Sequence, residues 1–448
     1  MAPQVSRFEH LALIALVFAL AFEESLPPVG TVSVGFVIFA LVALFILFRH
    51  HRALFLSLRH PVMLAFWFLV SVGILFEVFR QVPMLVYVRR IGLMALGVVL
   101  VAALVRDRGA MRTGLLAFTF VALIFTGMVV HIGGPELYSA SGMDFFEATA
   151  AQAGALRDLP IRGNINRMGF VIGVGGVVCI AVAGTFRRRW RLLVGLAGIF
   201  CLFGMALFAS RSAILVTLAA VATMVAMRGE KRARNAFFAT VLLAGIWFIV
   251  PEVSRARFAF GEISERGRED SRTRVYRMIA MSLPDVLPFG VGENRYWNEW
   301  ATDILGRRLG THNSLLQVTV LWGVPGLVGL ALVGFSVFRS LPDTRVRDPL
   351  RLCAWAVAVA VGMRWMATHG IYDKEFSVLL GILIGASIWI WPSKKGSGPA
   401  VVRRLRNPAG TQIAAHRSLA VDRDVPVRPW TGRGRLLGSV LDMERRTR

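Results

Sequence analysis

Apolar runs recur along this chain from residue 10 to residue 391, and most of them are long enough to cross a lipid bilayer as a helix. Lipid offers no partner for backbone polar groups, so such runs form helices, in which these groups bond within their own segment. We therefore predict an all-α, polytopic membrane protein with about 12 transmembrane helices. The predicted helices cover residues 10–24, 31–48, 62–77, 91–105, 112–131, 168–185, 192–208, 213–227, 236–251, 314–338, 352–368 and 375–391.

Short connections rich in arginine and lysine alternate with other connections along the chain. They span residues 49–60, 106–112, 186–191, 228–234 and 339–351. Because basic loops stay in the cytoplasm, the alternation predicts a cytoplasmic position for them and for both termini. It also explains much of the excess of 51 Lys and Arg over 27 Asp and Glu, so we expect no nucleic-acid partner. The outer segment 79–90 breaks the pattern with Arg80, Arg89 and Arg90: either this helix pair is misplaced or these arginines have a use.

Composition separates a helical membrane domain, residues 1–392, from a basic tail, residues 393–448. Two outer segments of the membrane domain, 132–167 and 252–312, exceed what a simple connection needs, and the second is the large outer loop. In the first, Phe145, Phe146, Ala150 and Leu156 have the spacing of a short helix on the membrane surface. The tail lacks periodicity, which predicts a disordered cytoplasmic extension that is either solvated or in contact with anionic lipid heads.

The stretch Thr311–Leu330 joins a titratable side chain to a membrane helix. His312 ends the large outer loop and, with Asn313, stands just before the apolar run. Neutral imidazole accepts a proton near pH 7, so His312 is a candidate general base. The alternative is a histidine that only bonds a neighbour at the start of a helix that Thr311 caps.

Arginines in the outer segments are candidate anion ligands. Arg211, flanked by Ser210 and Ser212, lies in a tight turn between two apolar runs. A guanidinium at membrane depth is costly, so Arg211 either meets an anion such as phosphate, which arginine binds through two hydrogen bonds, or extends to the interface. Arg272 and Arg274 lie in a helical pattern of the large loop, where nearby acidic residues make internal pairing the alternative.

Other motifs carry weaker indications. Asn166, in the stretch GNIN, precedes an apolar run, which a polar helix start would also explain. The glycines of FGVGEN follow no strand with P-loop spacing, which predicts a turn. No residues have the spacing of a metal site, so we expect neither a metal nor a cofactor. Cys179, Cys201 and Cys353 lie inside apolar runs and are predicted to be small buried hydrophobic residues.

In combination these elements resemble the O-antigen ligase and polymerase superfamily of bacterial inner-membrane glycosyltransferases. The resemblance covers roughly Phe208–Leu330 best. It rests on SRSA after an apolar run, an outer loop with an Arg-led helix and the stretch LPFGVGENRYW, and HNSLLQ followed by GVPGLVG. It implies about a dozen helices, one large periplasmic loop, an inner-membrane location and an active site on the periplasmic side. The family's histidine corresponds to His312 and its arginines to Arg211 and Arg272, with Arg274 as the alternative to Arg272.

The resemblance implies a metal-independent, inverting glycosyltransferase. It would transfer a glycan from an undecaprenyl-diphosphate carrier to a hydroxyl of lipid A–core, as ligases do in lipopolysaccharide or surface-polysaccharide assembly, or of another glycan, as polymerases do. Arg211 and Arg272 would hold the diphosphate, and His312 would deprotonate the acceptor. The other predicted substrate contacts are Arg274, Asn313, Asn166 and Ser210. Membrane lipids are further expected partners.

Two other interpretations fit the same sequence. The first is a transporter of lipid-linked glycans, which would more typically show inverted repeats and broken helices near the middle of the membrane. The second is a non-catalytic membrane scaffold, for which no single polar residue of the outer loop matters.

Overall fold

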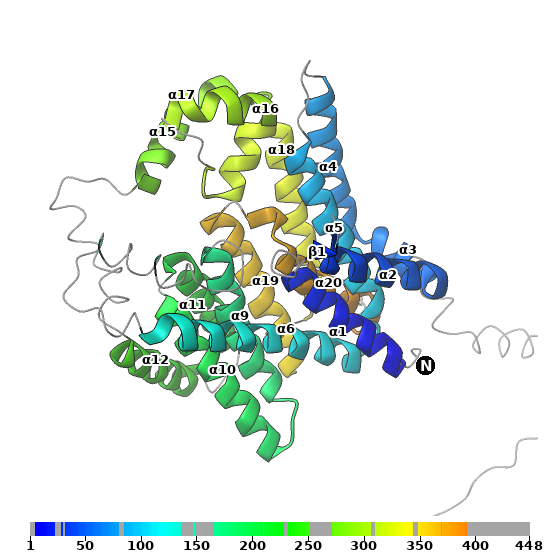
Figure 1. Cartoon of the computed structure of the whole chain (residues 1–448), viewed down its shortest axis with the longest axis vertical. Coiled ribbons are helices and arrows are strands. Elements are labelled where there is room, and N and C mark those ends of the chain that lie inside the picture. Colours follow the sequence, from blue (N-terminus) through cyan, green and yellow to red (C-terminus); the bar gives the residue numbers. More distant parts are fainter. Residues whose placement is uncertain are drawn as a thin grey trace, which may run out of the picture. The chain divides into compact units, whose positions relative to one another are not determined.

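The structure of the chain is a computed structural model (Figure 1). It describes residues 5–22, 28–29, 32–79, 85–135, 147, 154, 165–208, 210–227, 232–250, 271–305, 310–343, 348–368 and 370–391. The chain divides into two units, Met1–Gly396 and Ser397–Arg448, and every described residue lies in the first. The predicted tail, 393–448, lies outside the described residues, as do the four residues of the predicted surface helix: Phe145, Phe146, Ala150 and Leu156.

Helices form almost all of the described secondary structure, which confirms the predicted all-α class. In chain order they are α1 (Arg7–Phe22), α2 (Val34–Arg49), α3 (His51–Leu58), α4 (Pro61–Val78), α5 (Val86–Leu104), α6 (Arg108–Met128), α9 (Ile165–Ala183), α10 (Arg188–Phe208), α11 (Arg211–Ala226), α12 (Arg232–Ile249), α15 (Ser271–Val286), α16 (Glu293–Arg295), α17 (Ala301–Leu305), α18 (Ser314–Arg339), α19 (Pro349–Ala367) and α20 (Lys374–Trp389). Short turns of π- or 3-10 helix follow α6 (η1, Val129–Gly133), join α16 to α17 (η3, Tyr296–Trp300) and precede α20 (η4, Gly370–Tyr372). The two-residue strands β1 (Pro28–Val29) and β2 (Val32–Ser33) pair antiparallel.

Each of the predicted apolar runs overlaps a described helix of the structure. By length and composition, six of the described helices can cross a membrane, or seven if α2 and α3, bent by 104°, are one span. Three more apolar helices are shorter: Arg167–Ala183, Arg211–Ala226 and Ala233–Ile249. The chain therefore has the helices of a membrane protein, and the figure of about 12 spans stays a prediction.

One predicted connection is helical instead. Within 49–60 the chain forms α3, whose Ala53 and Ser57 are buried and whose Leu54 and Leu58 pack against the core. These residues recur at the helical spacing of three to four, so they give α3 an apolar face. The expectation of a plain loop was wrong because the basic residues at both ends concealed this face.

Capping side chains explain where several helices begin. Asp107 precedes α6, and its Oδ1 accepts the N–H of Ala110 at 2.7 Å. Asp348 precedes α19, its Oδ1 accepts the N–H of Leu350 at 3.1 Å, and Pro349 occupies the first helical position. Such caps satisfy backbone donors that the first turn of a helix leaves unpaired.

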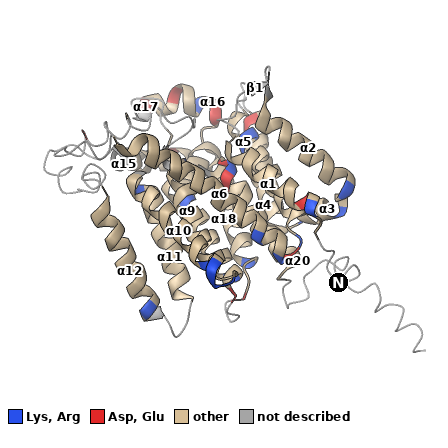
Figure 2. Ribbon diagram, turned by 60° about the horizontal axis from the view of Figure 1, so that its bottom comes forward, with Lys and Arg blue, Asp and Glu red and all other residues tan. Residues whose placement is uncertain are grey.

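Three of the arginine-rich connections, 49–60, 106–112 and 339–351, meet at one end of the helix bundle, which we call the basic end. Glu9, in the first turn of α1, bonds Arg106 at the end of α5 and lies 2.6 Å from Nε2 of His50 after α2. Arg108 at the start of α6 donates to Asp348 at 2.5 Å. The predicted connections 49–60, 106–112 and 339–351 are therefore neighbours. In Figure 2 the helices are tan over most of their length, and basic residues lie mainly near helix ends, as at the start of α12.

Candidate active site

The start of α18 is built by a short hydrogen-bonded turn. Asn313 is the N-cap: its Oδ1 accepts the N–H of Leu316 at 3.1 Å. Its Nδ2 donates to the carbonyl of Met366 near the end of α19 at 2.8 Å. Thr311, the predicted cap, instead donates its hydroxyl to the carbonyl of Asn313 at 2.7 Å. The expected cap was wrong by two residues, because Asn313 is the residue whose extended backbone directs its side chain to the first turn.

His312 is held in an unusual backbone conformation within this turn. Its φ is +55°, the one positive value recorded for a non-glycine residue in the described part of the chain. A left-handed conformation costs an L-residue about 1–2 kcal/mol, so the surrounding contacts must enforce it. One such contact is the hydroxyl of Tyr276 in α15, which donates to the carbonyl of His312 at 3.3 Å. The imidazole of His312 lies at a half-buried position at the end of the large loop.

This hydrogen bond brings α15, the helix of the predicted loop arginines, beside His312. Arg272 precedes Tyr276 by four residues and so lies about one turn away on the same helix face. Arg274 precedes Tyr276 by two residues, which places it on another face. Both residues are helical, and their side chains lie outside the described residues. The spacing therefore places Arg272, and not Arg274, on the helix face of Tyr276.

The start of α11 carries the other predicted anion ligand. Ser210 is its N-cap: the Oγ accepts the N–H of Ala213 at 3.4 Å and lies 3.3 Å from the Oγ of Ser212. Arg211 occupies the first helical position and is half-buried. The start of a helix has a partial positive charge, which disfavours a cation and favours an anion. Arg211 and the α11 dipole therefore attract a negatively charged group to the same place.

The starts of α11 and α18 lie at the same end of the bundle, opposite the basic end. α19 begins at the basic end, so its last residues, which hold the start of α18, lie at the opposite end. A Cβ placed on Gly173 of α9 would lie 2.1 Å from Oγ1 of Thr217 of α11, and each residue is about two turns into its helix. The guanidinium of Arg364 in α19 lies 5.5 Å from the ring centroid of Phe170 in α9. These contacts among α11, α9, α19 and α18 thus place the start of α11 and the start of α18, with their predicted site residues, at the same end of the bundle.

Arg364 is a charged residue that sequence analysis missed. It is 2% exposed, and its Nη2 donates to Oδ2 of Asp373 at 2.9 Å. It lies two residues before Met366, whose carbonyl holds Asn313. An arginine within an apolar run is costly unless it meets a partner, so its presence in the run 352–368 was the available signal. Arg364 therefore helps to fix the end of α19, which holds the turn that contains His312.

A second buried ion pair joins the starts of α9 and α20. Arg167 Nε bonds Oε1 of Glu375, which is 1% exposed. A carboxylate buried to this extent needs a cation partner, because desolvation otherwise disfavours its charge. Asn166, the predicted substrate contact, lies in the same first turn of α9, and its side chain is outside the described residues.

The glycine-rich stretch of the large loop docks into a break in α18. Gly323 has a φ of +62° within α18, which interrupts the helical hydrogen bonds. The N–H of Val291 donates to the carbonyl of Val320 at 2.7 Å, and the N–H of Gly292 donates to the carbonyl of Leu321 at 2.9 Å. A Cβ on Gly323 would lie 2.6 Å from the carbonyl oxygen of Leu287. The predicted turn in FGVGEN is confirmed, and the glycines let the two backbones touch.

Two buried carboxylates fix this docked segment to the ends of α4 and α5. Glu77 is 0% exposed and Glu293 is 1% exposed. The N–H of Glu293 donates to Oε1 of Glu77 at 2.6 Å, and the N–H of Tyr87 donates to both carboxylate oxygens of Glu293 at 2.9 and 2.8 Å. The preceding Leu85 offers no side-chain cap, so Glu293 caps α5 from the loop. Burial, with a contribution from Glu77, raises the pKa of Glu293 to about 7 against the effect of these hydrogen bonds.

Two of the three arginines in the outer segment 79–90, Arg89 and Arg90, lie near the start of α5. The guanidinium of Arg90 lies 5.4 Å from the ring centroid of Tyr372 in η4, within cation–π range. Arg89 is exposed near the start of α5, and Arg80 lies outside the described residues. Arg90 therefore has a structural use, which favours the second of the two interpretations given for the segment 79–90.

In chemical terms, this end of the bundle offers an imidazole and cations among apolar helices. Within the described ranges, no group of three or more His, Cys, Asp or Glu residues is placed to hold a metal ion. A proton acceptor at His312 and positive charge at the start of α11 are the groups that a transfer from a phosphate leaving group requires.

Part of the chain is similar to a family of known proteins. Residues 196–331 match the family model described as O-antigen ligase. The matched segment runs from α10 into α18 and includes Arg211, Arg272 and His312. Among curated proteins, none matches the chain significantly. The resemblance drawn from SRSA, the large loop and HNSLLQ is confirmed over residues 196–331, the part of the chain that is similar to the O-antigen ligase family.

Proposed function

We propose that the protein transfers a glycan from an undecaprenyl-diphosphate carrier to a hydroxyl of lipid A–core, as an O-antigen ligase. The family match supports a membrane glycosyltransferase of the O-antigen ligase or polymerase type. The observation that carries the finer proposal is the hydrogen bond from Tyr276 to His312, which sets the helix of Arg272 beside the strained histidine.

In the proposed reaction Arg211 and Arg272 bind the diphosphate, and His312 lies beside the acceptor hydroxyl. The hydroxyl oxygen attacks the anomeric carbon from the side opposite the diphosphate and gives its proton to the imidazole. The bond between the anomeric carbon and the diphosphate oxygen breaks, and its electron pair leaves with the diphosphate. The two guanidinium groups offset the growing negative charge, so the reaction proceeds with inversion and without a metal ion.

This reaction fits a protein of the bacterial inner membrane with both termini in the cytoplasm. The basic end would face the cytoplasm by the positive-inside rule, which puts His312 and Arg211 on the periplasmic side. In this arrangement 1–392 is the membrane domain, 252–312 is the large periplasmic loop, and Arg274, Asn313, Asn166 and Ser210 are further substrate contacts.

The test is a transfer assay on purified variants with a lipid-linked glycan and lipid A–core. We expect His312→Ala to lower the rate about 10²–10⁴-fold, the usual contribution of a general base. Arg211→Ala and Arg272→Ala should cause similar losses, and Arg211→Lys should recover only part, because lysine lacks the planar fork of arginine.

Matched controls come from the same regions. His131→Ala removes an exposed histidine after α6, and Arg277→Ala removes an exposed arginine on another face of α15. Both should retain full activity. A folded His312→Ala protein with the activity of these controls would contradict the assignment of the base.

A polymerase is the alternative within the family, because the same site would serve an acceptor that is another carrier-linked glycan. Deleting the gene separates the two: loss of all attached polymer indicates a ligase, and single repeats without long chains indicate a polymerase. A transporter is less well supported, because the break in α18 is filled by backbone of the large loop. Liposomes without acceptor should therefore show no translocation of the lipid-linked glycan.

A further inference from the structure

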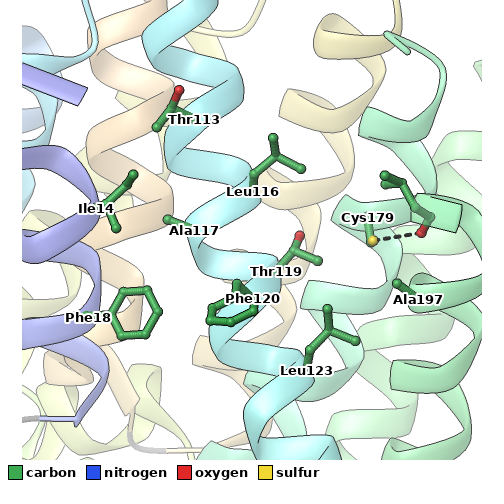
Figure 3. Close-up of a pocket in the computed structure, with 11 residues that line it drawn as sticks. Ile14, Phe18, Thr113, Leu116, Ala117, Thr119, Phe120, Leu123, Cys179 and Ala197 are labelled. Atoms are coloured by element: carbon green, nitrogen blue, oxygen red, sulfur yellow. Dashed lines mark hydrogen bonds between the residues drawn. The ribbon is translucent and has the colours of Figure 1, made fainter. Parts of the chain in front are cut away.

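An apolar groove of about 430 Å³ opens between α1, α6, α9 and α10 (Figure 3). Phe18 from α1, Leu116 and Leu123 from α6, and Ala197 from α10 are among its lining residues. The thiol of Cys179 also faces it, but donates to the carbonyl of Val194 at 2.9 Å. Lining atoms without neighbours lose dispersion contacts, so a groove of this kind among membrane helices is stabilised when an apolar chain fills it.

The groove has the length of one leaflet of a bilayer. Along α6 it extends from Thr113 to Leu123, ten residues, or about 15 Å at the helical rise per residue. The hydrocarbon core of a bilayer is about 30 Å thick, so this is about half of it. Thr113 lies in the second turn of α6, so the groove begins close to the basic end, and it stops at Leu123, five residues before the last residue of α6. These dimensions suit one acyl chain whose head group lies at the basic end.

Two arginines stand at that mouth of the groove. Arg112 comes directly before Thr113, and Arg191 comes one helical turn before Val194. Both contact Phe186: the guanidinium of Arg112 lies 5.3 Å from its ring centroid, and Nη2 of Arg191 donates to its carbonyl at 3.2 Å. Both arginines are exposed, and neither pairs with a carboxylate in the part of the chain that the structure describes.

Two like charges held around one residue repel each other unless an anion joins them. A phosphate accepts two hydrogen bonds from each guanidinium, and a phospholipid carries its phosphate at the end of an acyl chain. The two arginines thus suit the phosphate of a phospholipid, and the apolar groove suits its acyl chain. A neutral or zwitterionic lipid would fill the groove but offset less of the charge.

We propose that the groove between α1, α6, α9 and α10 binds an anionic phospholipid, with its phosphate at Arg112 and Arg191 and one acyl chain along α6. This lipid is separate from the substrates of the proposed transfer reaction, whose residues lie at the opposite end of the bundle. It acts as a structural lipid that joins the α1–α6 pair to the α9–α10 pair.

The experiment measures phospholipid binding to the full chain in detergent. Phosphatidylglycerol is titrated against phosphatidylcholine and undecaprenyl phosphate, and the shift in unfolding temperature and the lipid mass retained in native mass spectrometry are recorded. We expect phosphatidylglycerol to be retained at one molecule per chain and to raise the unfolding temperature more than the other two lipids. The double variant Arg112→Gln/Arg191→Gln should bind it about 30-fold more weakly, from roughly one order of magnitude or less per surface arginine.

Matched variants separate the two parts of the site. Ala197→Phe fills the groove and should abolish retention, whereas Leu196→Phe, at an exposed neighbouring position outside the lining, should not. Arg52→Gln removes the same charge from the exposed surface of α3 and should leave binding unchanged. Equal stabilisation by phosphatidylcholine, preferred retention of undecaprenyl phosphate, or full binding by the double arginine variant would each overturn the proposal.

Discussion

The two ends of this helix bundle differ less in charge than in backbone conformation. At the basic end, short connections bring Arg108, whose side chain is 61% exposed, to Asp348, and they also hold the buried pair of Glu9 and Arg106. At the opposite end, Arg364 and Glu293 are almost fully buried, and His312 has a strained backbone. Exposed pairs contribute little because water screens them, whereas buried polar groups are costly and persist only where many contacts hold them. Both ends hold buried ion pairs, so what distinguishes the opposite end is the strained backbone of His312 and the loop backbone docked into α18.

The largest effect on the difference between the two ends is expected from a variant that relaxes the backbone strain at His312. We expect His312→Gly to lower transfer about 10²–10⁴-fold through loss of the base. Because glycine adopts a positive φ without steric cost, this variant should be about 1 kcal/mol more stable than His312→Ala. Transfer assays and unfolding followed by tryptophan fluorescence check the two effects. Equal stability of both variants would mean that the backbone of His312 is not strained.

The contact between the large loop and α18 should fail when glycine is lost at the break. Gly323→Ala places a Cβ 2.6 Å from the carbonyl oxygen of Leu287 at a φ of +62°. We expect a loss of about 2–4 kcal/mol in the free energy of unfolding, from steric overlap and backbone strain together. Gly334→Ala in the same helix is the control, because a Cβ there has no neighbour within 4 Å. A Gly323→Ala protein as stable as this control would rule out the observed docking.

A pH series sharpens the role of the buried carboxylates. The pKa of Glu293 is raised from 4.5 to about 7 by burial, so between these values the folded chain holds a proton that the unfolded chain releases. Its contribution to stability is therefore full below about pH 4.5 and is lost as the pH rises through 7. Glu293→Gln, neutral at every pH, should remove this slope from denaturant unfolding curves. Glu299→Gln, at an exposed position in the same loop, should keep it, and an unchanged slope in Glu293→Gln would refute the assignment.

A smaller effect should follow from removing the link between α15 and His312. Tyr276→Phe deletes the hydroxyl that donates to the His312 carbonyl at 3.3 Å, at a cost of about 1 kcal/mol in stability. If this bond positions the histidine, the maximal rate should fall while the Michaelis constant for the lipid-linked glycan changes little. Steady-state kinetics test this, and a change in the Michaelis constant alone would point to a role in binding instead.

The smallest effect is expected at the basic end. Arg108→Gln removes an ion pair whose arginine is mostly exposed, so stability should change by about 0.5 kcal/mol or less, and transfer should not change. Thermal unfolding at low and high salt measures the first, and the glycan transfer assay measures the second. A loss of activity comparable to that of His312→Ala would show that the two ends are not functionally distinct.

The sequence located much of this architecture because its signals are local. Apolar runs predict helices wherever the backbone must bond within its own segment, and every predicted run overlaps a described helix. The resemblance carried by SRSA and HNSLLQ is confirmed by the family model over residues 196–331. The glycines of FGVGEN predicted a turn, and Gly290 and Gly292 have the positive φ angles that few other residues adopt.

Other features depend on residues distant in the chain, and the sequence did not reveal them. Arg364 and Asp373 meet because of how α19 turns into α20, and Glu77 meets Glu293 across 216 positions. The cap of α18 is Asn313 and not Thr311. Both residue types are suitable N-caps, and the backbone conformation at the end of the loop decides which of them reaches the first turn.

By itself, then, the sequence determined that this is a helical membrane protein, where its helices lie and which family its residues 196–331 resemble. Only the tertiary structure decided that Tyr276 touches His312, that the loop fills the break in α18, and that a groove one leaflet long ends at Arg112 and Arg191. The physical reason is that hydrophobic length and backbone preference act within one segment, whereas a site forms where several segments meet.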